Sequence, residues 1–293
     1  MIAFLTSLRH PETATNYTRV EELFGLCARS VCSQTHDDIR FLVVCNQIPN
    51  IGFDDPRIQY IKVDFPVPQK QEGQLISHAH YDLDKGLKIA SGTWHSLEFS
   101  PKYLFIVDAD DWLDHRIATY ADANDSEAGF AVDRSYMVNF EEMTYKRRRG
   151  GAECFGSTIC PSLPTMLATF PEILRYKTQP SYQDLIEGVD SRKLGHLIGR
   201  HRLARHCQNT GRAFKRFPFF AASWVVDNGE NNLGPWEHSK NNRPINTDFL
   251  IKHGLHGNVF PTVTKHSRHL RESLAYAKET CRWIHKDLTS STF

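Results

Sequence analysis

Three acidic side chains, Asp108, Asp110 and Asp111, directly follow the apolar segment Tyr103-Leu-Phe-Ile-Val107. An apolar run of this length is typical of a buried strand, and residues two apart on a strand point the same way. Neighbouring carboxylates repel one another unless a cation neutralises them, and Mg²⁺ and Mn²⁺ prefer oxygen ligands. The cluster therefore predicts a divalent-cation site formed by Asp108 and Asp110. The alternative is a solvated turn that caps the strand.

The elements that must position this cluster alternate between strands and helices. Apolar runs predict strands, and helical spacing of apolar residues predicts helices at 17–34 and 82–97. The strands are expected at residues 1–8, 41–45, 58–63 and 103–107. This order predicts an α/β fold, with a mostly parallel sheet flanked by helices. Ligands bind beyond the carboxyl ends of such strands. The candidate positions are Thr6 to Arg9, Cys45 to Gln47 and Asp108 to Asp111.

The second half of the chain is less regular. Residues 141–151, which include the basic run Lys146 to Arg149 and two glycines, are predicted to form a mobile loop. Helical structure broken near Gly188 or Gly195 is expected over 181–207, and a strand over 217–226. A loop at 64–77 and a C-terminal helix at 267–286 complete the expected elements.

The composition is that of an ordinary globular protein. The 293 residues include 35 Lys+Arg and 34 Asp+Glu, which gives a net charge of +1, and 40% are apolar. These values argue against disorder and against a general nucleic-acid binder. Seven cysteines without a C-x-x-C pair are typical of reduced thiols. The longest apolar run is about half of the ~20 residues that a membrane span needs. A cytoplasmic location is therefore expected.

Three segments resemble, in order, motifs of the family 2-like glycosyltransferases of the GT-A fold. Residues Phe24 to Val44 are similar to the family's first helix and second strand. Asp84 to Gly92 is similar to its glycine-rich helix, and Phe105 to Leu113 to its Asp-x-Asp strand end. The resemblance covers residues 1–115, which it marks as a nucleotide-sugar-binding half. Residues 116–293 would then be an irregular half of the same domain that carries the acceptor site and the catalytic base.

The resemblance implies sugar transfer from a nucleotide diphosphate sugar to a glycan or lipid-linked acceptor, with inversion and with Mn²⁺ or Mg²⁺. A cation beside the diphosphate would stabilise the charge of the leaving group. Asp110 would bind the metal, and Asp108 the metal or the ribose. Lys85 would contact the diphosphate or the donor sugar, unless it is an exposed helix lysine. The nucleotide would contact Thr6, Ser7 and Arg9.

One departure from the family lies after the second strand. The family usually has an acidic residue there, whereas this chain has Cys45 and Asn46. The Asn46 amide can hydrogen-bond a base edge. The donor nucleotide therefore stays open.

An inverting transfer needs a base that removes the proton from the acceptor hydroxyl. The resemblance points to Asp190 first, Glu187 second and Asp184 third. These residues alternatively serve as helix N-terminal acids that complement the helix dipole.

The segment 191–226 contains eight Lys and Arg residues and no acid. It can attract a diphosphate, an anionic acceptor or the inner face of a membrane, or it is a solvated face paired with acids elsewhere. The family often adds a late histidine to the metal shell. The candidates here are His238, His253, His256, His266 and His269. Trp224 and Trp236 are candidates for stacking on a sugar, although Trp224 lies in an apolar run typical of a core.

Two other functions compete with the transferase. A metal-dependent phosphohydrolase also carries Asp-x-Asp after a strand, but there the motif usually follows the first strand. A non-catalytic glycan- or lipid-binding protein on the same fold would bind no nucleotide.

Overall fold

Four apolar runs form the centre of a seven-stranded sheet in the structure, a computed structural model that describes residues 1–69, 79–150, 156–230 and 242–256. They are β1 (Ile2–Ser7), β2 (Ile39–Cys45), β3 (Ile58–Lys62) and β4 (Tyr103–Ile106). β1 pairs in parallel with β2 and β4, and β2 pairs in parallel with β3. All four strands lie where the sequence predicts them.

The sheet continues beyond β4 with strands from the second half of the chain. These are β9 (Ile159–Pro161), β6 (Gly129–Ala131) and β10 (Lys215–Arg216), in the order β10-β6-β9-β4-β1-β2-β3. β9 is antiparallel to both neighbours, while β10 and β6 are parallel. The expected α/β fold with a mostly parallel sheet is therefore confirmed.

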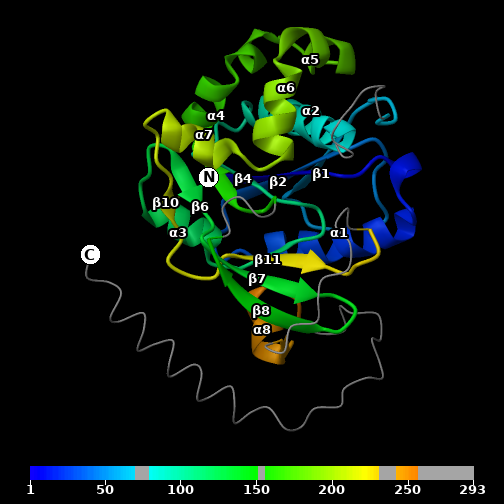
Figure 1. Cartoon of the computed structure of the whole chain (residues 1–293), viewed down its shortest axis with the longest axis vertical. Helices are drawn as coiled ribbons and strands as arrows, with labels where there is room; N and C mark the ends of the chain where they lie inside the picture. Colours follow the sequence, from blue (N-terminus) through cyan, green and yellow to red (C-terminus); the bar gives the residue numbers. More distant parts are fainter. Residues whose placement is uncertain (70–78, 151–155, 231–241, 257–293) are drawn as a thin grey trace. The chain divides into compact units, whose positions relative to one another are not determined.

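Helices cover both faces of this sheet (Figure 1). α1 (Tyr17–Cys32) packs on one face, and α2 (Ala79–Ser96) packs on the other, as expected. Each face of the sheet has its own hydrophobic core, and alternate residues of each strand point into one core or the other. Phe4 packs with α1, and Leu5 packs with α2. The α2 face also carries a group of shorter helices. These are α4 (Leu163–Thr169), η3 (Pro171–Arg175), α5 (Tyr182–Gly188), α6 (Ser191–Leu194), η4 (Gly195–Gly199) and α7 (Leu203–Asn209).

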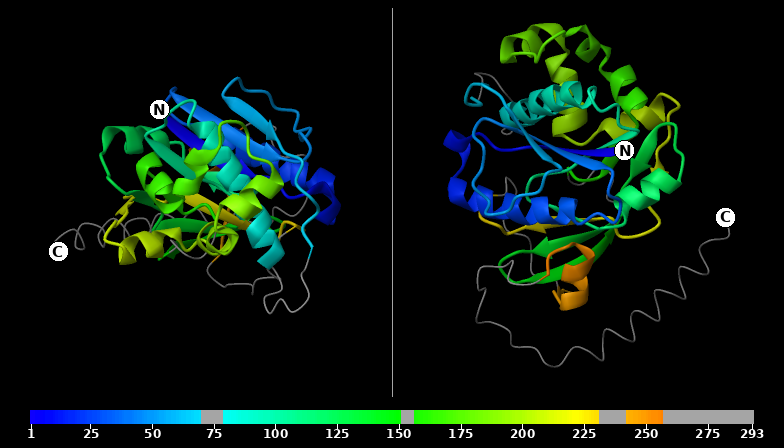
Figure 2. Two further views of the ribbon diagram at one scale, coloured as in Figure 1. Left: turned by 90° about the horizontal axis from the view of Figure 1, so that it is seen from above. Right: turned by 180° about the vertical axis from the view of Figure 1, so that it is seen from behind.

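A second sheet of five strands lies on the side of α1 that faces away from the seven-stranded sheet (Figure 2). Its order is β12-β8-β7-β11-β5, and the small helix α8 (Thr247–Lys252) packs beside it. Met137, Trp224 and Val226 from this sheet share the core of α1. The five strands are β5 (Trp112–Leu113), β7 (Arg134–Asn139), β8 (Thr144–Arg149), β11 (Ala222–Val226) and β12 (Arg243–Pro244).

The mobile loop predicted for residues 141–151 is wrong for most of its length. Thr144 to Arg149 is strand β8, which pairs antiparallel with β7 and β12. Cross-strand partners and aromatic neighbours hold this basic run in the sheet, because Arg147 lies over the Phe220 ring and Arg148 over the Trp224 ring. The predicted core position of Trp224 agrees with its burial.

The helical region predicted at 181–207 breaks at both glycines. α5 ends at Gly188, and the π-helical turn η4 begins at Gly195. The predicted strand at 217–226 is shorter, since β11 begins at Ala222. The other short helices are η1 (Pro11–Thr13) and α3 (Ile117–Ala123). The helix expected at 267–286 lies outside the described residues, as do His238, His266, His269 and Trp236.

Among the described residues, no helix has the length and apolar character needed to cross a membrane. Five cysteines in the described ranges are buried free thiols: Cys27, Cys32, Cys45, Cys160 and Cys207.

Candidate active site at the carboxyl ends of β1 and β4

The chain reverses its direction across the sheet between β1 and β4. β2 and β3 follow on one side of β1, and β4 returns on the other side. At such a point the connections leave the strand ends in opposite directions and open a crevice where ligands bind. Residues Thr6 to Arg9 follow β1, and Asp108 to Asp111 follow β4, so two of the predicted positions meet there.

The turn after β4 is fixed by backbone contacts. The Val107 N–H donates to the Leu5 carbonyl oxygen at 3.0 Å, and the Asp111 N–H donates to the Asp108 carbonyl oxygen at 3.1 Å. The Asp108 N–H donates to Ser157 Oγ at 2.8 Å. The aspartates therefore emerge from a closed turn in defined positions.

Lys85 of α2 reaches the first of these aspartates. Its ammonium forms an ion pair with Asp108 Oδ1. The backbone of Gly156 lies against the same carboxylate, because a Cβ at that position would overlap it. Burial raises the pKa of Asp108, but the charge of the Lys85 ammonium and its hydrogen bond outweigh burial and hold that pKa below its ordinary value. Asp108 is therefore an ionised carboxylate with its own counter-ion.

Asp110 contacts the loop that follows β11. The Asn228 side-chain amide donates to Asp110 Oδ2 at 2.8 Å. Burial and the nearby Asp108 carboxylate raise the pKa of Asp110 to about 6. The loop that follows β11 therefore reaches the acid cluster through Asn228.

Asp111 is completely buried beneath the cluster. The Val225 N–H donates to its Oδ1 at 3.0 Å, whereas its buried Oδ2 has no hydrogen-bond partner. Burial, followed by the charges of Asp110 and Asp108, raises the pKa of Asp111 well above its ordinary value. Asp111 therefore holds β11 against the turn after β4.

Cys27 of α1 contacts the turn that carries the cluster. The Cys27 thiol donates to the Asp108 carbonyl oxygen at 3.5 Å. Burial and the neighbouring aspartates raise the pKa of Cys27 well above its ordinary value. A thiol held in this form is a poor nucleophile.

His201 approaches Lys85 and Asp108 from the segment after η4. Its φ of 58° lies in the left-handed region, which non-glycine residues seldom adopt outside constrained sites. Arg200 Nε donates to Asp82 Oδ2 at 3.0 Å, and Gly199 packs on the Asp82 backbone. Burial and the Lys85 ammonium lower the pKa of His201 to about 3. Contacts with α2 therefore hold a neutral imidazole beside the acid cluster.

The residues after β1 are tied to the same loop as Asp110. Arg9 Nη1 donates to Glu230 Oε2 at 2.9 Å. The same buried carboxylate accepts the N–H groups of Thr15 and Asn16 at 3.2 and 2.6 Å. Thr6 is buried and its hydroxyl has no hydrogen-bond partner among the described residues, whereas Ser7 is partly exposed.

Asn46 follows β2 at the same edge of the sheet. Its side-chain amide donates to the Phe65 carbonyl oxygen at 2.7 Å, and its Oδ1 is buried without a hydrogen-bond partner. The amide donor is thus occupied by the chain, and a contact between Asn46 and a nucleotide base stays a prediction.

The predicted base residues lie on the short helices of the α2 face. Asp190 caps α6 by accepting the Lys193 N–H at 2.9 Å, and Glu187 accepts from Gln183. Asp184 forms a capping box with Ser181. Asp190 and Asp184 make the contacts of helix N-terminal acids, whereas Glu187 lies near the C-terminal end of α5. A role as base stays a prediction for all three.

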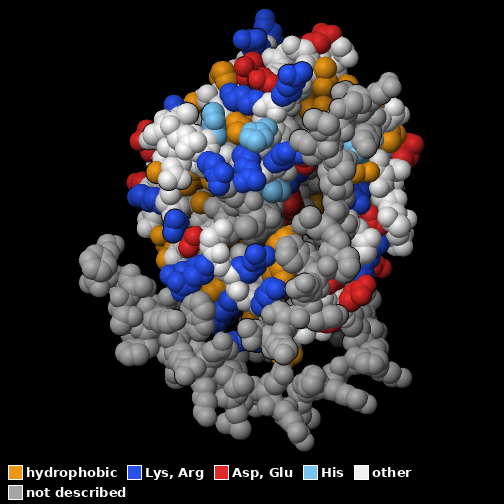
Figure 3. Space-filling model, in the orientation of Figure 1, with side chains coloured by type: hydrophobic (Ala, Val, Ile, Leu, Met, Phe, Trp, Pro, Cys, Tyr) orange, Lys and Arg blue, Asp and Glu red, His pale blue; other side chains and the backbone are white. Residues whose placement is uncertain are grey.

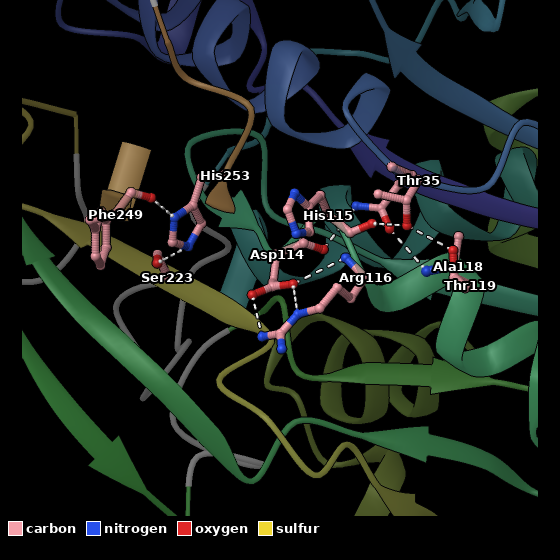
Figure 4. A network of polar contacts seen from close by, with 10 residues as sticks. Thr35, Asp114, His115, Arg116, Ala118, Thr119, Ser223, Phe249 and His253 are labelled. Carbon is pink, nitrogen blue, oxygen red and sulfur yellow. Dashed lines mark hydrogen bonds and ion pairs between the residues drawn. The ribbon is translucent and has the colours of Figure 1, made fainter. Parts of the chain in front are cut away.

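His253, a candidate for the metal shell, is a buried structural residue (Figure 4). Its Nε2 lies 2.8 Å from Ser223 Oγ and its Nδ1 lies 2.7 Å from the Phe249 carbonyl oxygen. Both ring nitrogens are therefore engaged. His256 is exposed after α8.

The basic segment 191–226 is partly paired with the rest of the fold. Besides the Arg200–Asp82 pair, Arg216 lies 3.5 Å from Asp133, and Lys193 Nζ donates to the Thr169 carbonyl oxygen at 2.6 Å. In Figure 3, Lys, Arg and His side chains gather around a hollow in which acidic side chains show. Contact with a membrane through this segment stays a prediction.

The carboxylates of the cluster have the chemistry that a hard cation prefers, but they face different partners. Asp108 faces Lys85, while Asp110 and Asp111 accept from Asn228 and from the Val225 N–H. No group of three or more His, Cys, Asp or Glu side chains in the described part of the chain is placed to hold a metal ion. The predicted site needs only one or two of these carboxylates together with a substrate diphosphate, so Mn²⁺ or Mg²⁺ stays a prediction.

Sequence reasoning missed several residues that build this site. Ser157 and Gly156 contact Asp108. Asn228 and Glu230, which follow β11, form hydrogen bonds with Asp110 and Arg9. The turn-forming run from Asp227 was the available signal for the last two residues. His201 lies in the basic segment 191–226, outside any motif of catalytic residues or metal ligands.

Comparison with known proteins finds no matching family model and no matching curated protein. Among solved structures, 108 chains match. One is S. aureus TarS, at 10% identity and a TM-score of 0.39, over 77% of this chain and 36% of TarS. This chain thus spans little more than a third of TarS. Another is an active-site mutant of LgtC, at 13% identity and a TM-score of 0.31, over 77% of this chain and 87% of LgtC. At TM-scores below 0.5, neither likeness carries an argument about this chain.

Proposed function

We propose that this chain is a glycosyltransferase that takes its sugar from a nucleotide diphosphate sugar bound across the carboxyl ends of β1 and β4. The observation that carries the proposal is the acid cluster at this switch point. Asp108 and Asp110 lie in the crevice, Lys85 lies beside them, and the residues after β1 adjoin.

The chemistry of transfer suits a site of this kind. An acceptor hydroxyl oxygen forms a bond to the anomeric carbon, and the bond from that carbon to the phosphate oxygen breaks. The electron pair goes to the leaving diphosphate, and the hydroxyl proton goes to a base. Fixed positive groups beside the diphosphate lower the energy of the transition state. Lys85 can act in this way, and Asp190 or Glu187 is the predicted base.

We propose a glycan or a lipid-linked glycan as the acceptor. This choice rests only on the resemblance to the family 2-like glycosyltransferases. Inversion at the anomeric carbon and metal dependence stay predictions of the same resemblance. The donor nucleotide is open, because Asn46 stands where the family has an acid.

Calorimetric titration with UDP, GDP, CDP and dTDP, each with and without Mn²⁺, tests the proposal. The wild type is compared with Asp110→Asn and with Asp125→Asn, which changes an exposed aspartate outside the site. We expect one nucleotide to bind, weakly or not at all to Asp110→Asn and normally to Asp125→Asn. Failure of all four nucleotides to bind under either condition would refute the proposal.

Two further assays address the competing functions. Release of free phosphate from a phosphomonoester, lost in Asp108→Asn, would indicate the phosphohydrolase. Binding of a glycan without any nucleotide would indicate the non-catalytic protein.

A further inference from the structure

We propose that strand β8 binds the acceptor of the transfer, and that this acceptor is an anionic glycan, one that carries phosphate or carboxylate groups. The inference rests on the proposed function and names the class of acceptor. It is carried by five cations, Arg134 of β7 and Lys146 to Arg149 of β8, which together form a basic strip on the second sheet.

The basic strip concentrates positive charge on two neighbouring strands. β7 and β8 contain these five cations and no Asp or Glu. Arg134 and Arg149 stand directly opposite each other in the register of the two strands. Like charges in this position destabilise a sheet. An anion that lies over both strands offsets this repulsion, so the strip favours a negatively charged ligand.

Aromatic rings hold two of the guanidinium groups. Arg147 Cζ lies 5.3 Å from the centre of the Phe220 ring, and Arg148 Cζ lies 5.8 Å from the centre of the Trp224 ring. Contact with a ring orients the planar set of N–H donors of a guanidinium. This set matches the two oxygens of a phosphate or a carboxylate, so the strip suits the binding of such groups.

Two of the cations share a face of the sheet with Trp224. Met137 pairs with both Lys146 and Trp224, and residues that pair across strands lie on the same face. Arg148 follows Lys146 by two residues, so it points to this face as well, and its Nη1 donates to Met137 Sδ at 3.6 Å. Lys146 and Arg148 are both partly exposed, so a ligand can reach them.

The strip lies close to the acid cluster. β5 begins directly after Asp111, and β8 is the third strand from β5 in the order β12-β8-β7-β11-β5. At the usual spacing of strands, the strip is about 14 Å from the turn that carries the cluster. Figure 3 shows Lys and Arg side chains over β7 and β8, beside the hollow in which acidic side chains show. A bound chain of a few sugar units can therefore extend from the strip to the crevice.

The surroundings of the strip favour a dissolved polyanion over a membrane surface. Binding to an anionic bilayer depends on apolar side chains that enter the interface, as well as on cations. The large apolar residues that the described ranges expose are Ile48, Leu174 and Ile251, and none of them lies on β7 or β8. An anionic glycan needs only the cations, which also offset its repulsion from the aspartates in the crevice.

Three dextrans of equal chain length test the chemistry of the ligand: neutral dextran, dextran phosphate and carboxymethyl dextran. The full chain is titrated with each by calorimetry, at low and at high salt. We expect the anionic dextrans to bind and neutral dextran not to bind. Their affinity should fall by about 10-fold or more at high salt, because salt screens ion pairs with exposed cations. The tighter of the two anionic dextrans identifies phosphate or carboxylate as the preferred group.

A double variant then tests the strip itself. Lys146→Gln combined with Arg148→Gln removes the two cations on the Trp224 face. We expect the anionic dextrans to bind this variant about 10-fold or more weakly, and the nucleotide to bind it as it binds the wild type. The matched control combines Arg175→Gln with Lys177→Gln, two exposed cations at the same spacing on the α2 face, and should bind both ligands normally. Thermal melting checks that each variant is folded.

Several outcomes would overturn the inference and leave the proposed transferase intact. They are equal binding of neutral and anionic dextrans, absence of binding to any dextran, and equal affinity of the wild type and the double variant. Binding to vesicles of phosphatidylcholine and phosphatidylglycerol in place of the anionic dextrans would assign the strip to a membrane instead. A parallel loss of nucleotide affinity in the folded double variant would assign it to the donor. Failure of every nucleotide to bind the wild type overturns the proposed function, whether or not the anionic dextrans bind.

Discussion

Lys88 is a completely buried cation between α2 and the end of β1. Its Nζ donates to the Leu8 carbonyl oxygen and to Asp84 Oδ2, both at 2.9 Å, and the Asp84 side chain is only 13% exposed. Lys88→Met keeps the length of the side chain but leaves the Asp84 carboxylate without its cation. Because breaking a buried pair on one side costs about 3–5 kcal/mol, we expect the free energy of unfolding to fall by that amount.

The loss depends on pH in a direction that the structure sets. Burial raises the pKa of Asp84 even with Lys88 in place. Without Lys88 this pKa rises further, so the folded variant holds a proton that the unfolded chain releases. When the pKa of an acid is higher in the folded chain than in the unfolded chain, the free energy of unfolding falls as pH rises from the unfolded pKa to the folded pKa. The deficit of Lys88→Met relative to wild type should therefore be largest at pH 7 and should shrink toward pH 4.

Urea unfolding followed by tryptophan fluorescence measures both effects. With a slope of about 2–3 kcal/mol/M, the predicted loss moves the midpoint down by about 1–2.5 M. Lys88→Met combined with Asp84→Asn should recover part of the loss, since no unpaired charge remains. Lys252→Met, at an exposed lysine, should change stability by less than about 0.5 kcal/mol. A loss below about 1 kcal/mol at pH 7, or equal losses at both pH values, would refute the reasoning.

Two further predictions concern the acid cluster. The pKa of Asp110 is raised to about 6 from an ordinary value of 3.8, so its ionisation destabilises the folded chain as pH rises between these values. In EDTA, Asp110→Asn should therefore melt at a higher temperature than wild type at pH 7 and at the same temperature at pH 3.5; a lower melting temperature at pH 7 would contradict this. Gly156→Ala places a Cβ on the Asp108 carboxylate, so nucleotide affinity should fall by about 10-fold or more. Thermal melting, which should change by only a few degrees, separates this effect from unfolding; unchanged affinity would count against it.

The central strands were predictable because a strand that is buried on both faces consists of consecutive apolar residues. β1, β2 and β4 are covered by helices on both faces, so their sequences are continuous apolar runs. α1 and α2 show apolar residues at helical spacing because each packs on the sheet through one side. These patterns are local, and they specify the strand ends where the acid cluster lies.

The strands of the second half could not be predicted, because their places in the sheet depend on pairing with segments that are distant in the sequence. β8 is basic, and its place in the sheet follows from β7 and from the rings of Phe220 and Trp224. β7 was not predicted at all. Its place in the sheet is set by its neighbours β8 and β11, since Met137 pairs with both Lys146 and Trp224.

The candidate site was predictable to the extent that one segment supplies it. The aspartates directly follow β4, and the rule for strand ends located them. His201, Asn228 and Glu230 come from segments whose approach depends on tertiary packing, and their own sequences carry no chemical motif. The partnership of Lys85 with Asp108 joins residues 23 positions apart and depends on how α2 crosses the sheet.

The contacts that close the site have a consequence for the order of folding. Ser157 meets Asp108 across 49 positions, Asn228 meets Asp110 across 118, and Glu230 meets Arg9 across 221. Contacts of such long range carry a high loop-closure cost and slow the folding of a chain. During synthesis, β1 to β4 can pair while residues 228–230 have yet to be made. Arg9 therefore gains its Glu230 partner only after almost the whole described chain has been synthesised. The nucleotide binding that we propose would then report that folding is complete.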